Sequence, residues 1–199
     1  MDLFDLSKEV AVVLGAGGAL GGAMAEGLAE AGAGVAVLDF VAERGEARAG
    51  SIVAKGRRAV FVECNALDRA SLRHAHETVV RAMGEPTVLV NAVGGNDPAA
   101  QVTEERPLEQ LTAEAWRANF DLNLVGGVLF PCQEFGPAMV SRGRGSIVNI
   151  ASVSAHSPLS RVIAYSAAKA AVLSLTRFLA REWASKGVRV NSITPGFFP

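Results

Sequence analysis

Short apolar stretches recur along the chain and are separated by longer segments with helical periodicity. The apolar stretches cover residues 10–14, 35–38, 59–62, 88–92, 147–150 and 188–193. We interpret each as apolar throughout rather than alternating, which is typical of strands buried on both faces of a parallel sheet. Between them, helices are predicted at residues 20–31, 42–54, 70–83, 113–140 and 162–186. We expect Pro131 and Pro137 to kink or shorten the fourth helix.

Strands that alternate with helices predict an α/β fold: a doubly wound parallel sheet of Rossmann-like type, with helices on both faces. Four glycines, Gly32, Gly56, Gly84 and Gly187, fall where helices are expected to end, as helix C-termini prefer. The chain contains no internal repeat, low-complexity segment or linker. We therefore expect residues 1–199 to form a single domain.

A glycine-rich segment, Gly-Ala-Gly-Gly-Ala-Leu-Gly-Gly at residues 15–22, follows the first predicted strand directly and leads into a helix. Glycines let the backbone approach a pyrophosphate, whose charge meets the free N–H groups at the helix N-terminus. Asp39 ends the second predicted strand, where a carboxylate can accept hydrogen bonds from ribose hydroxyls and repel a 2′-phosphate. This favours NAD(H) over NADP(H), although Asp39 can also cap the next helix and the nearby Arg44 weakens the preference.

Tyr165 and Lys169 are four residues apart on the last predicted helix, and Ser152 precedes the tyrosine by thirteen residues. Four residues is just over one helical turn, so the phenol and the ammonium share a face. A free phenol has a pKa of about 10, and a neighbouring ammonium favours the phenolate. The pair therefore predicts an acid/base, and Ser152 a neutral donor to a substrate carbonyl. A buried tyrosine beside a solvated lysine is the alternative that the spacing alone leaves open.

Composition narrows the range of partners. The net charge of the 199 residues is −1, so no attraction to nucleic acid or to a membrane surface is expected. Residues 1–8 do not resemble a signal peptide, and Cys64 and Cys132 form no Cys-x-x-Cys motif, which together predict a cytoplasmic protein with reduced thiols. His74 and His76 are two residues apart on a helix and point in different directions, so no metal site is expected.

Several ordered motifs resemble the short-chain dehydrogenase/reductase superfamily across essentially all 199 residues. They are the glycine loop, Val90-Asn91-Ala92-Val93-Gly94, Asn123 within Asp121-Leu122-Asn123, the trio Ser152, Tyr165 and Lys169, and Pro195-Gly196. The resemblance implies hydride transfer between NAD(H) and a carbonyl or secondary alcohol. It implies a catalytic set of Asn123, Ser152, Tyr165 and Lys169, in which Asn123 holds a water linked to Lys169.

The resemblance also implies a set of cofactor-binding residues. These are Gly15, Gly17, Gly18, Leu20, Gly21, Asp39, Asn65, Ala66, Asn91, Gly94, Tyr165, Lys169, Pro195 and Gly196. Three positions depart from the superfamily pattern. Leu14 stands in place of a threonine, Ala19 in place of a glycine and Asn65 in place of an aspartate. We expect the cofactor to bind despite them. Because the superfamily normally continues beyond Pro-Gly, we also expect a substrate-covering segment and a last strand to be missing from this chain.

Within the superfamily, the chain resembles the D-mannonate oxidoreductase-like group in three segments. These are the sequences of the glycine loop, of residues 91–96 and of Pro158-Leu159-Ser160-Arg161. This implies a small-molecule substrate of sugar-acid type, D-mannonate or D-fructuronate. Arg161 can hold its carboxylate in bidentate fashion, and Asn96 and His156 can contact its hydroxyls, beside Ser152 and Tyr165. A surface ion pair is the alternative role for Arg161.

Two other functions remain open. A reductase of 3-oxoacyl thioesters would need a basic surface for a phosphorylated carrier, for which only Arg142 and Arg144 are candidates. A non-catalytic NAD(H)-sensing or scaffold protein would be free to lose Tyr165 or Lys169, yet both are present. By resemblance, we expect a homo-oligomer, either a dimer or a tetramer, in which the helices of Asn123 and Tyr165 pair with their copies.

Overall fold

The predicted strands assemble into one parallel sheet. The computed structural model describes residues 4–197, and the sheet within them has the order β3-β2-β1-β4-β5-β6. The strands are β1 (Val10–Leu14), β2 (Gly34–Asp39), β3 (Ala59–Glu63), β4 (Val88–Asn91), β5 (Gly145–Ile150) and β6 (Val188–Ile193). The chain builds outward from β1 to β3, then returns to β4 on the other side of β1. A crevice for ligands is expected where the order reverses, at the carboxyl ends of β1 and β4.

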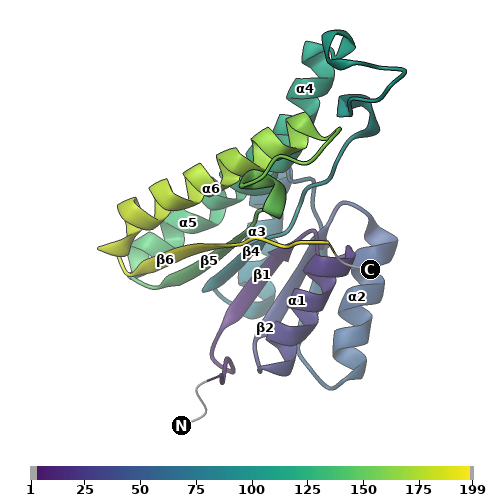
Figure 1. Cartoon of the computed structure of the whole chain (residues 1–199). Helices are drawn as coiled ribbons and strands as arrows, with labels where there is room; N and C mark the ends of the chain where they lie inside the picture. Colours follow the sequence, from purple (N-terminus) through teal and green to yellow (C-terminus); the bar gives the residue numbers. More distant parts are fainter. Residues whose placement is uncertain (1–3, 198–199) are drawn as a thin grey trace.

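Helices cover both faces of this sheet, as Figure 1 shows. They are α1 (Ala19–Glu30), α2 (Ala42–Ala54), α3 (Arg69–Met83), α4 (Ala113–Phe120), α5 (Phe130–Arg142) and α6 (Ile163–Ala184), with a π-helix, η3 (Asp121–Leu129), joining α4 to α5. Short 3₁₀ turns are η1 (Pro98–Ala100), η2 (Leu108–Gln110) and η4 (Val153–Ala155). Helices α1 and α2 lie on one face, and α3, α5 and α6 on the other. The doubly wound α/β prediction is confirmed.

Alternate residues of the central strand enter two separate hydrophobic clusters. Val12 and Leu14 of β1 pack with residues of α3, α5 and α6, whereas Ala11 and Val13 pack with residues of α1 and α2. A strand buried on both faces requires apolar residues at consecutive positions, which explains the unbroken run in the sequence. The same burial holds the carboxyl end of β1, and hence the glycine loop, in a fixed position.

Strand β6 differs from the prediction that every strand is apolar throughout. Val188 and Val190 are buried, whereas Arg189 and Asn191 are exposed. The strand lies at the edge of the sheet and α6 packs on one of its faces. Its alternating sequence is therefore that of a strand with one buried face, and the interpretation as a strand covered on both faces is wrong for β6.

The fourth predicted helix is interrupted before its prolines rather than at them. Residues 121–129 form a π-helix, in which the N–H of Phe130 donates to the carbonyl of Val125, five residues earlier. Pro131 lies in the first turn of α5 and Pro137 in its interior. Because a proline lacks an N–H, the carbonyl in the turn before it loses its helical hydrogen bond. The prediction of an interrupted helix is confirmed, since α5 begins beside Pro131, whereas Pro137 does not end it.

All four glycines expected at helix ends have positive φ angles, between 72° and 103°, which favour glycine. Within residues 4–197, one long helix, α6, is long and apolar enough to meet the length and composition of a membrane span. It packs against β5 and β6, and its buried side includes Val172 and Leu179. In this fold α6 is thus a core helix that carries Tyr165 and Lys169.

Candidate active site

Two adjoining cavities open at the carboxyl ends of the strands. The larger, of about 460 Å³, is bounded by the glycine loop and by the ends of β2 and β3, and its lining includes Gly15, Asp39 and Asn65. The smaller, of about 160 Å³, is lined by residues that include Ser152, Tyr165 and Lys169. Ala92 and Gly94, which follow β4, line both cavities. The two cavities therefore share a wall at the point where the strand order reverses.

The glycine loop comes close to its neighbours because it lacks side chains. Gly15 has a φ of 74°, and a Cβ there would stand 2.9 Å from the carbonyl oxygen of Ala92. A Cβ on Gly21 would collide with the carbonyl oxygen of Gly15. The N–H of Gly22 donates to Gly18 at 2.9 Å, so the N–H groups of residues 19–21 lie in the first turn of α1, where helices bind anions. This loop fits a dinucleotide pyrophosphate, and Ala19 is exposed rather than packed into it.

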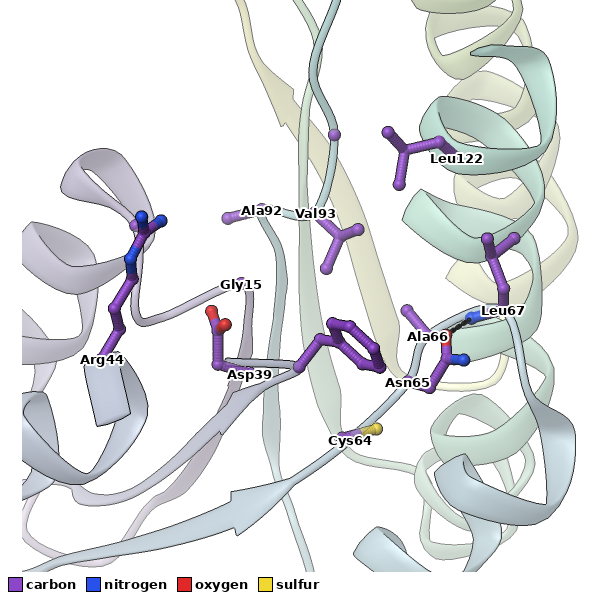
Figure 2. Close-up of a pocket in the computed structure, with 13 residues that line it drawn as sticks. Gly15, Asp39, Arg44, Cys64, Asn65, Ala66, Leu67, Ala92, Val93 and Leu122 are labelled. Carbon is purple, nitrogen blue, oxygen red and sulfur yellow. Dashed lines mark hydrogen bonds between the residues drawn. The ribbon is translucent and has the colours of Figure 1, made fainter. Parts of the chain in front are cut away.

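Asp39 and Arg44 lie on one side of the larger cavity, with Asn65, Leu67 and Leu122 opposite them (Figure 2). The Asp39 carboxylate accepts hydrogen bonds from the N–H of Gly17 at 2.8 Å and of Val41 at 2.9 Å. A carboxylate has about four acceptor positions, so capacity remains for ribose hydroxyls. Arg44 lines the same cavity and could meet a 2′-phosphate.

Opposite Asp39, the segment after β3 closes the cavity. The side-chain oxygen of Asn65 accepts a hydrogen bond from the N–H of Leu67 at 3.0 Å, which Figure 2 marks as a dashed line. One lone pair of this oxygen remains for a ligand donor. Ala66, which is predicted to bind the cofactor, lines this cavity. Burial raises the pKa of the neighbouring Cys64 thiol to about 11, so this thiol is protonated and unreactive at neutral pH.

Tyr165 and Lys169 project from α6 into the smaller cavity. The Lys169 Nζ lies 5.6 Å from the centroid of the Tyr165 ring and donates to the carbonyl of Ile150 at 2.8 Å. A Cβ on Gly94 would stand 3.0 Å from that Nζ, so a glycine lets the loop pass the ammonium. Burial lowers the pKa of Lys169 to about 8, with only 4% of the residue exposed. The amine remains mostly protonated at pH 7.

Ser152 reaches the same cavity from the turn after β5. The N–H of Ala151 donates to the carbonyl of Ile193 at 2.8 Å and that of Val153 to the carbonyl of Pro195 at 3.0 Å, so the end of β6 and the residues after it hold the turn on both sides of the serine. Ser152 Oγ accepts hydrogen bonds from the N–H of Ser154 at 3.2 Å and from its hydroxyl at 3.0 Å. This turn packs against α6, the helix that carries Tyr165.

Asn123 and Asn91 lie behind the cavities rather than in their walls. In the π-helix, Asn123 Oδ1 accepts from the N–H of Gly95 at 3.0 Å, and its Nδ2 donates to the Gly95 carbonyl at 2.7 Å. The side chain thus ties the helix to the loop after β4, while its role in holding a water stays a prediction. Asn91 Nδ2 donates to Asn149 Oδ1 at 2.8 Å, inside the core.

The three residues predicted only for substrate binding are not in the wall of the smaller cavity. Arg161 is exposed, has a φ of 71°, and its carbonyl accepts from the N–H of Val102 at 2.8 Å. The pKa of Glu105 lies below its usual range, because the Glu105 backbone and the Thr103 side chain donate hydrogen bonds to its carboxylate, and the charge of Arg161 lowers it further. His156 is also exposed, whereas the buried Asn96 Oδ1 has no partner among the described residues.

Some residues of the site were not anticipated. Ser154 is buried behind Ser152, and Gly95 bonds Asn123. Leu67 and Leu122 form an apolar wall of the larger cavity. Leu67 follows the end of β3, so position after a strand could have indicated it, whereas the contact of Ser154 depends on how the turn folds. Among the described residues, no group of three or more His, Cys, Asp or Glu side chains could hold a metal ion.

This geometry agrees with comparisons to known proteins. The sequence pattern that defines the short chain dehydrogenase family matches residues 9–199. The chain belongs to the short-chain dehydrogenase family. It is thus an oxidoreductase by family, with a fold that binds a nicotinamide cofactor. A solved structure named for the D-mannonate oxidoreductase group is among its similar proteins, which agrees with the likeness found in the sequence.

Three similar proteins illustrate the range of this short-chain dehydrogenase's relatives. D-threitol dehydrogenase of Mycolicibacterium smegmatis is 37% identical over 193 residues, which cover 96% of this chain and 71% of the relative. A Haemophilus influenza protein provisionally named a D-mannonate oxidoreductase, solved with bound NAD, has a TM-score of 0.93 at 32% identity and covers 98% of this chain and 73% of its own. Gluconate 5-dehydrogenase of Burkholderia cenocepacia, solved with NADP and tartrate, has a TM-score of 0.89 at 30% identity, with coverages of 100% and 74%.

Proposed function

We propose that this short-chain dehydrogenase transfers hydride between NAD(H) and a secondary alcohol or carbonyl of a sugar acid, of the D-mannonate and D-fructuronate type. The observation that carries the proposal is that Ser152, Tyr165 and Lys169 line one cavity. That cavity shares Ala92 and Gly94 with the cavity beside the glycine loop. A substrate oxygen in the smaller cavity would therefore lie beside the nicotinamide end of a dinucleotide held by the larger one.

The residues of the smaller cavity divide the proton chemistry between them. A bound nicotinamide would supply or accept the hydride at the substrate carbon. The Tyr165 hydroxyl would exchange the proton on the substrate oxygen, beside the buried ammonium of Lys169, which lies 5.6 Å from the ring centroid. Ser152 would donate a hydrogen bond to the same oxygen. Lys169 would also bond the nicotinamide ribose. Asn123, tied to Gly95, would hold the water linked to Lys169.

Asp39 supports a preference for NAD(H) over NADP(H). Its carboxylate is fixed by the N–H groups of Gly17 and Val41 at the mouth of the larger cavity. A 2′-phosphate would bring a second negative charge to this position, and repulsion between like charges would weaken its binding. The similar Haemophilus protein was solved with NAD, which agrees, whereas the gluconate dehydrogenase was solved with NADP.

The sugar-acid substrate rests on the resemblance and on similar proteins, rather than on a carboxylate clamp. The similar proteins are named for D-mannonate, gluconate and D-threitol, so they include both acids and a neutral polyol. Arg161 lies outside the smaller cavity and near Glu105. If Arg161 holds the substrate carboxylate, Arg161→Ala raises the KM for D-fructuronate. An unchanged KM in an active variant would assign the arginine to the surface.

The alternatives receive less support. Arg142 pairs with Glu85 and Arg144 with Glu9, both near the amino ends of the strands, at the opposite edge of the sheet from the cavities. These arginines therefore do not offer a free basic surface for a phosphorylated carrier. A non-catalytic sensor would not need Ser152, Tyr165 and Lys169 in one cavity.

A homo-oligomer in the cytoplasm, either dimer or tetramer, stays part of the proposal. Phe178 on α6 is 58% exposed and Ile163 on the same helix is 39% exposed, and burying them against a copy of this helix would remove apolar surface from water. A substrate-covering segment and a last strand beyond residue 199 stay a prediction, and Phe198 and Pro199 lie outside the described residues. Residues 1–3, which belong to the segment 1–8 that does not resemble a signal peptide, also lie outside the described residues.

An absorbance assay of NADH tests the proposed function. The panel comprises D-fructuronate, other keto sugar acids, neutral keto sugars and 3-oxoacyl thioesters. We expect turnover with a keto sugar acid and a loss of kcat of about 100-fold or more in Tyr165→Phe, since general acid catalysis contributes at least this much. NADH binding without turnover on any substrate would favour the sensor, and turnover of thioesters alone would favour the carrier-dependent reductase.

A further inference from the structure

We propose that Ser154 is a positioning residue that directs the hydroxyl proton of Ser152 toward the substrate oxygen. The inference rests on the proposed function, in which Ser152 donates a hydrogen bond to that oxygen. It concerns a residue two positions further along the chain, in the 3₁₀ turn η4. Ser154 does not line the cavity itself, so it would act through Ser152.

Ser154 contacts Ser152 through two donors. Its backbone N–H lies 3.2 Å from Ser152 Oγ, and its own Oγ lies 3.0 Å from the same atom. Ser154 is 1% exposed, so bulk water does not compete for either contact. Ser152 is 8% exposed and faces the cavity that holds Tyr165 and Lys169. The accepting oxygen is thus at the edge of the cavity and its two donors are behind it.

The hydrogen-bonding capacity of a hydroxyl decides what this contact does. A serine hydroxyl has two acceptor positions and one proton to donate. When Ser154 fills both acceptor positions of Ser152, the Ser152 oxygen cannot accept from the substrate, and its proton is left to donate. The reverse arrangement, in which Ser152 donates to Ser154, would leave the buried Ser154 proton without an acceptor among the bonds found in the described residues.

Donation is also the role that the reaction needs from Ser152. The substrate oxygen gains negative charge as hydride reaches the adjoining carbon, and a fixed donor stabilises that charge. The turn is already held, because the carbonyl of Ser152 accepts from the N–H of Ala155 at 3.0 Å and Val153 bonds Pro195. Ser154 therefore adds control over the direction of the hydroxyl rather than over the path of the backbone.

The test is a double-mutant cycle of Ser154→Ala and Ser152→Ala. Alanine at 154 keeps the backbone N–H and removes only the hydroxyl donor. We expect Ser154→Ala to lower kcat about three- to ten-fold, the effect of one hydrogen bond, with unchanged affinity for NADH. In the Ser152→Ala background, the same substitution should have no further effect on kcat, because the group through which it acts is gone.

A matched control separates positioning from a loss of stability. Thr176→Val removes another buried hydroxyl, on α6, that bonds Asn149 and Val172 and does not contact Ser152. It should lower the melting temperature at least as much as Ser154→Ala while kcat holds. Independent, multiplying losses of kcat at 152 and 154 would overturn the inference. A wild-type enzyme without turnover, or an unaffected Ser152→Ala, would instead overturn the proposed function.

Discussion

The two cavities differ in which atoms of the protein form them, backbone in the larger and side chains in the smaller. The larger one depends on backbone that comes close because side chains are missing, at Gly15 and Gly21. The smaller one depends on side chains whose polar atoms are paired one by one, as Lys169 is with Ile150 and Ser152 with Ser154. One half of the site is therefore sensitive to added atoms and the other to removed ones.

The difference follows from what each half binds. A pyrophosphate is recognised by N–H groups that every residue carries, so the requirement there is access, which glycine provides. A reacting carbonyl needs a proton donor, an acid/base and a nearby cation, which only particular side chains provide. Substitutions of opposite kinds should thus disable the two halves, and the predictions below test this from the largest expected effect to the smallest.

Adding one methyl group at Gly21 should have the largest effect. Its Cβ would collide with the carbonyl oxygen of Gly15, so the helix and the loop must move apart. We expect Gly21→Ala to destabilise the fold by about 1–3 kcal/mol, the usual cost of overpacking, and to abolish measurable NADH binding. Thermal unfolding and NADH fluorescence titration measure the two effects.

Gly27 on the same helix provides the matched control. A Cβ there meets nothing within 4 Å and the position is exposed. Gly27→Ala should stabilise the protein by about 0.5–1 kcal/mol, because alanine is the better helix former, and should leave NADH affinity unchanged. If Gly21→Ala binds NADH as tightly as Gly27→Ala, the glycine loop is not the constraint that the structure indicates.

Removing one buried hydroxyl in the core, at a position that lines neither cavity, should lower the stability of the fold. Thr176 Oγ1 accepts from Asn149 Nδ2 at 2.9 Å and donates to the Val172 carbonyl at 2.7 Å, within the core. Thr176→Val leaves the Asn149 amide without its acceptor, which costs about 1–3 kcal/mol. The free energy of unfolding in urea measures the loss. An unchanged value would mean that Asn149 finds another partner, and the pairing would matter less than proposed.

The side-chain half also contains a titrating group. The pKa of Lys169 falls from 10.5 to about 8 through burial. The folded protein therefore loses this proton between pH 8 and 10.5, whereas the unfolded chain keeps it. The unfolded chain binds more protons in that window, so this group makes the fold more stable as pH rises through it.

Cofactor binding should change in the opposite direction over the same window. The Lys169 ammonium would attract the anionic cofactor, so NADH affinity should be constant below pH 8 and fall by up to about tenfold per pH unit above it. Titrations between pH 6.5 and 9.5 measure this. Lys169→Met, which cannot titrate, should bind weakly with a flat profile. A wild-type profile that is also flat would argue against contact between the ammonium and the cofactor.

Much of the fold could be predicted from sequence, because doubly buried strands require unbroken apolar runs. β1 and α2 have the predicted bounds, whereas the alternation in β6 and the π-helix before Pro131 were not predicted. Side chains one helical turn apart, such as Tyr165 and Lys169, could also be paired from spacing. The Ser152–Ser154 contact and the left-handed backbone of Arg161 could not, because both depend on how a turn folds against distant strands.

Substitution of Arg44 should give the smallest effect. Arg44 contributes a charged side chain to the larger cavity, which otherwise depends on closely approaching backbone. It lines the larger cavity near Asp39, where it could attract the 2′-phosphate that Asp39 repels. An exposed charge contributes up to about 1 kcal/mol, so Arg44→Ala should weaken NADPH binding about three-fold and leave NADH binding unchanged. Arg48→Ala is the control, because Arg48 is on the same helix but pairs with Glu26. Equal losses for both cofactors in Arg44→Ala would show that this arginine does not distinguish them, and the preference would then depend on Asp39 alone.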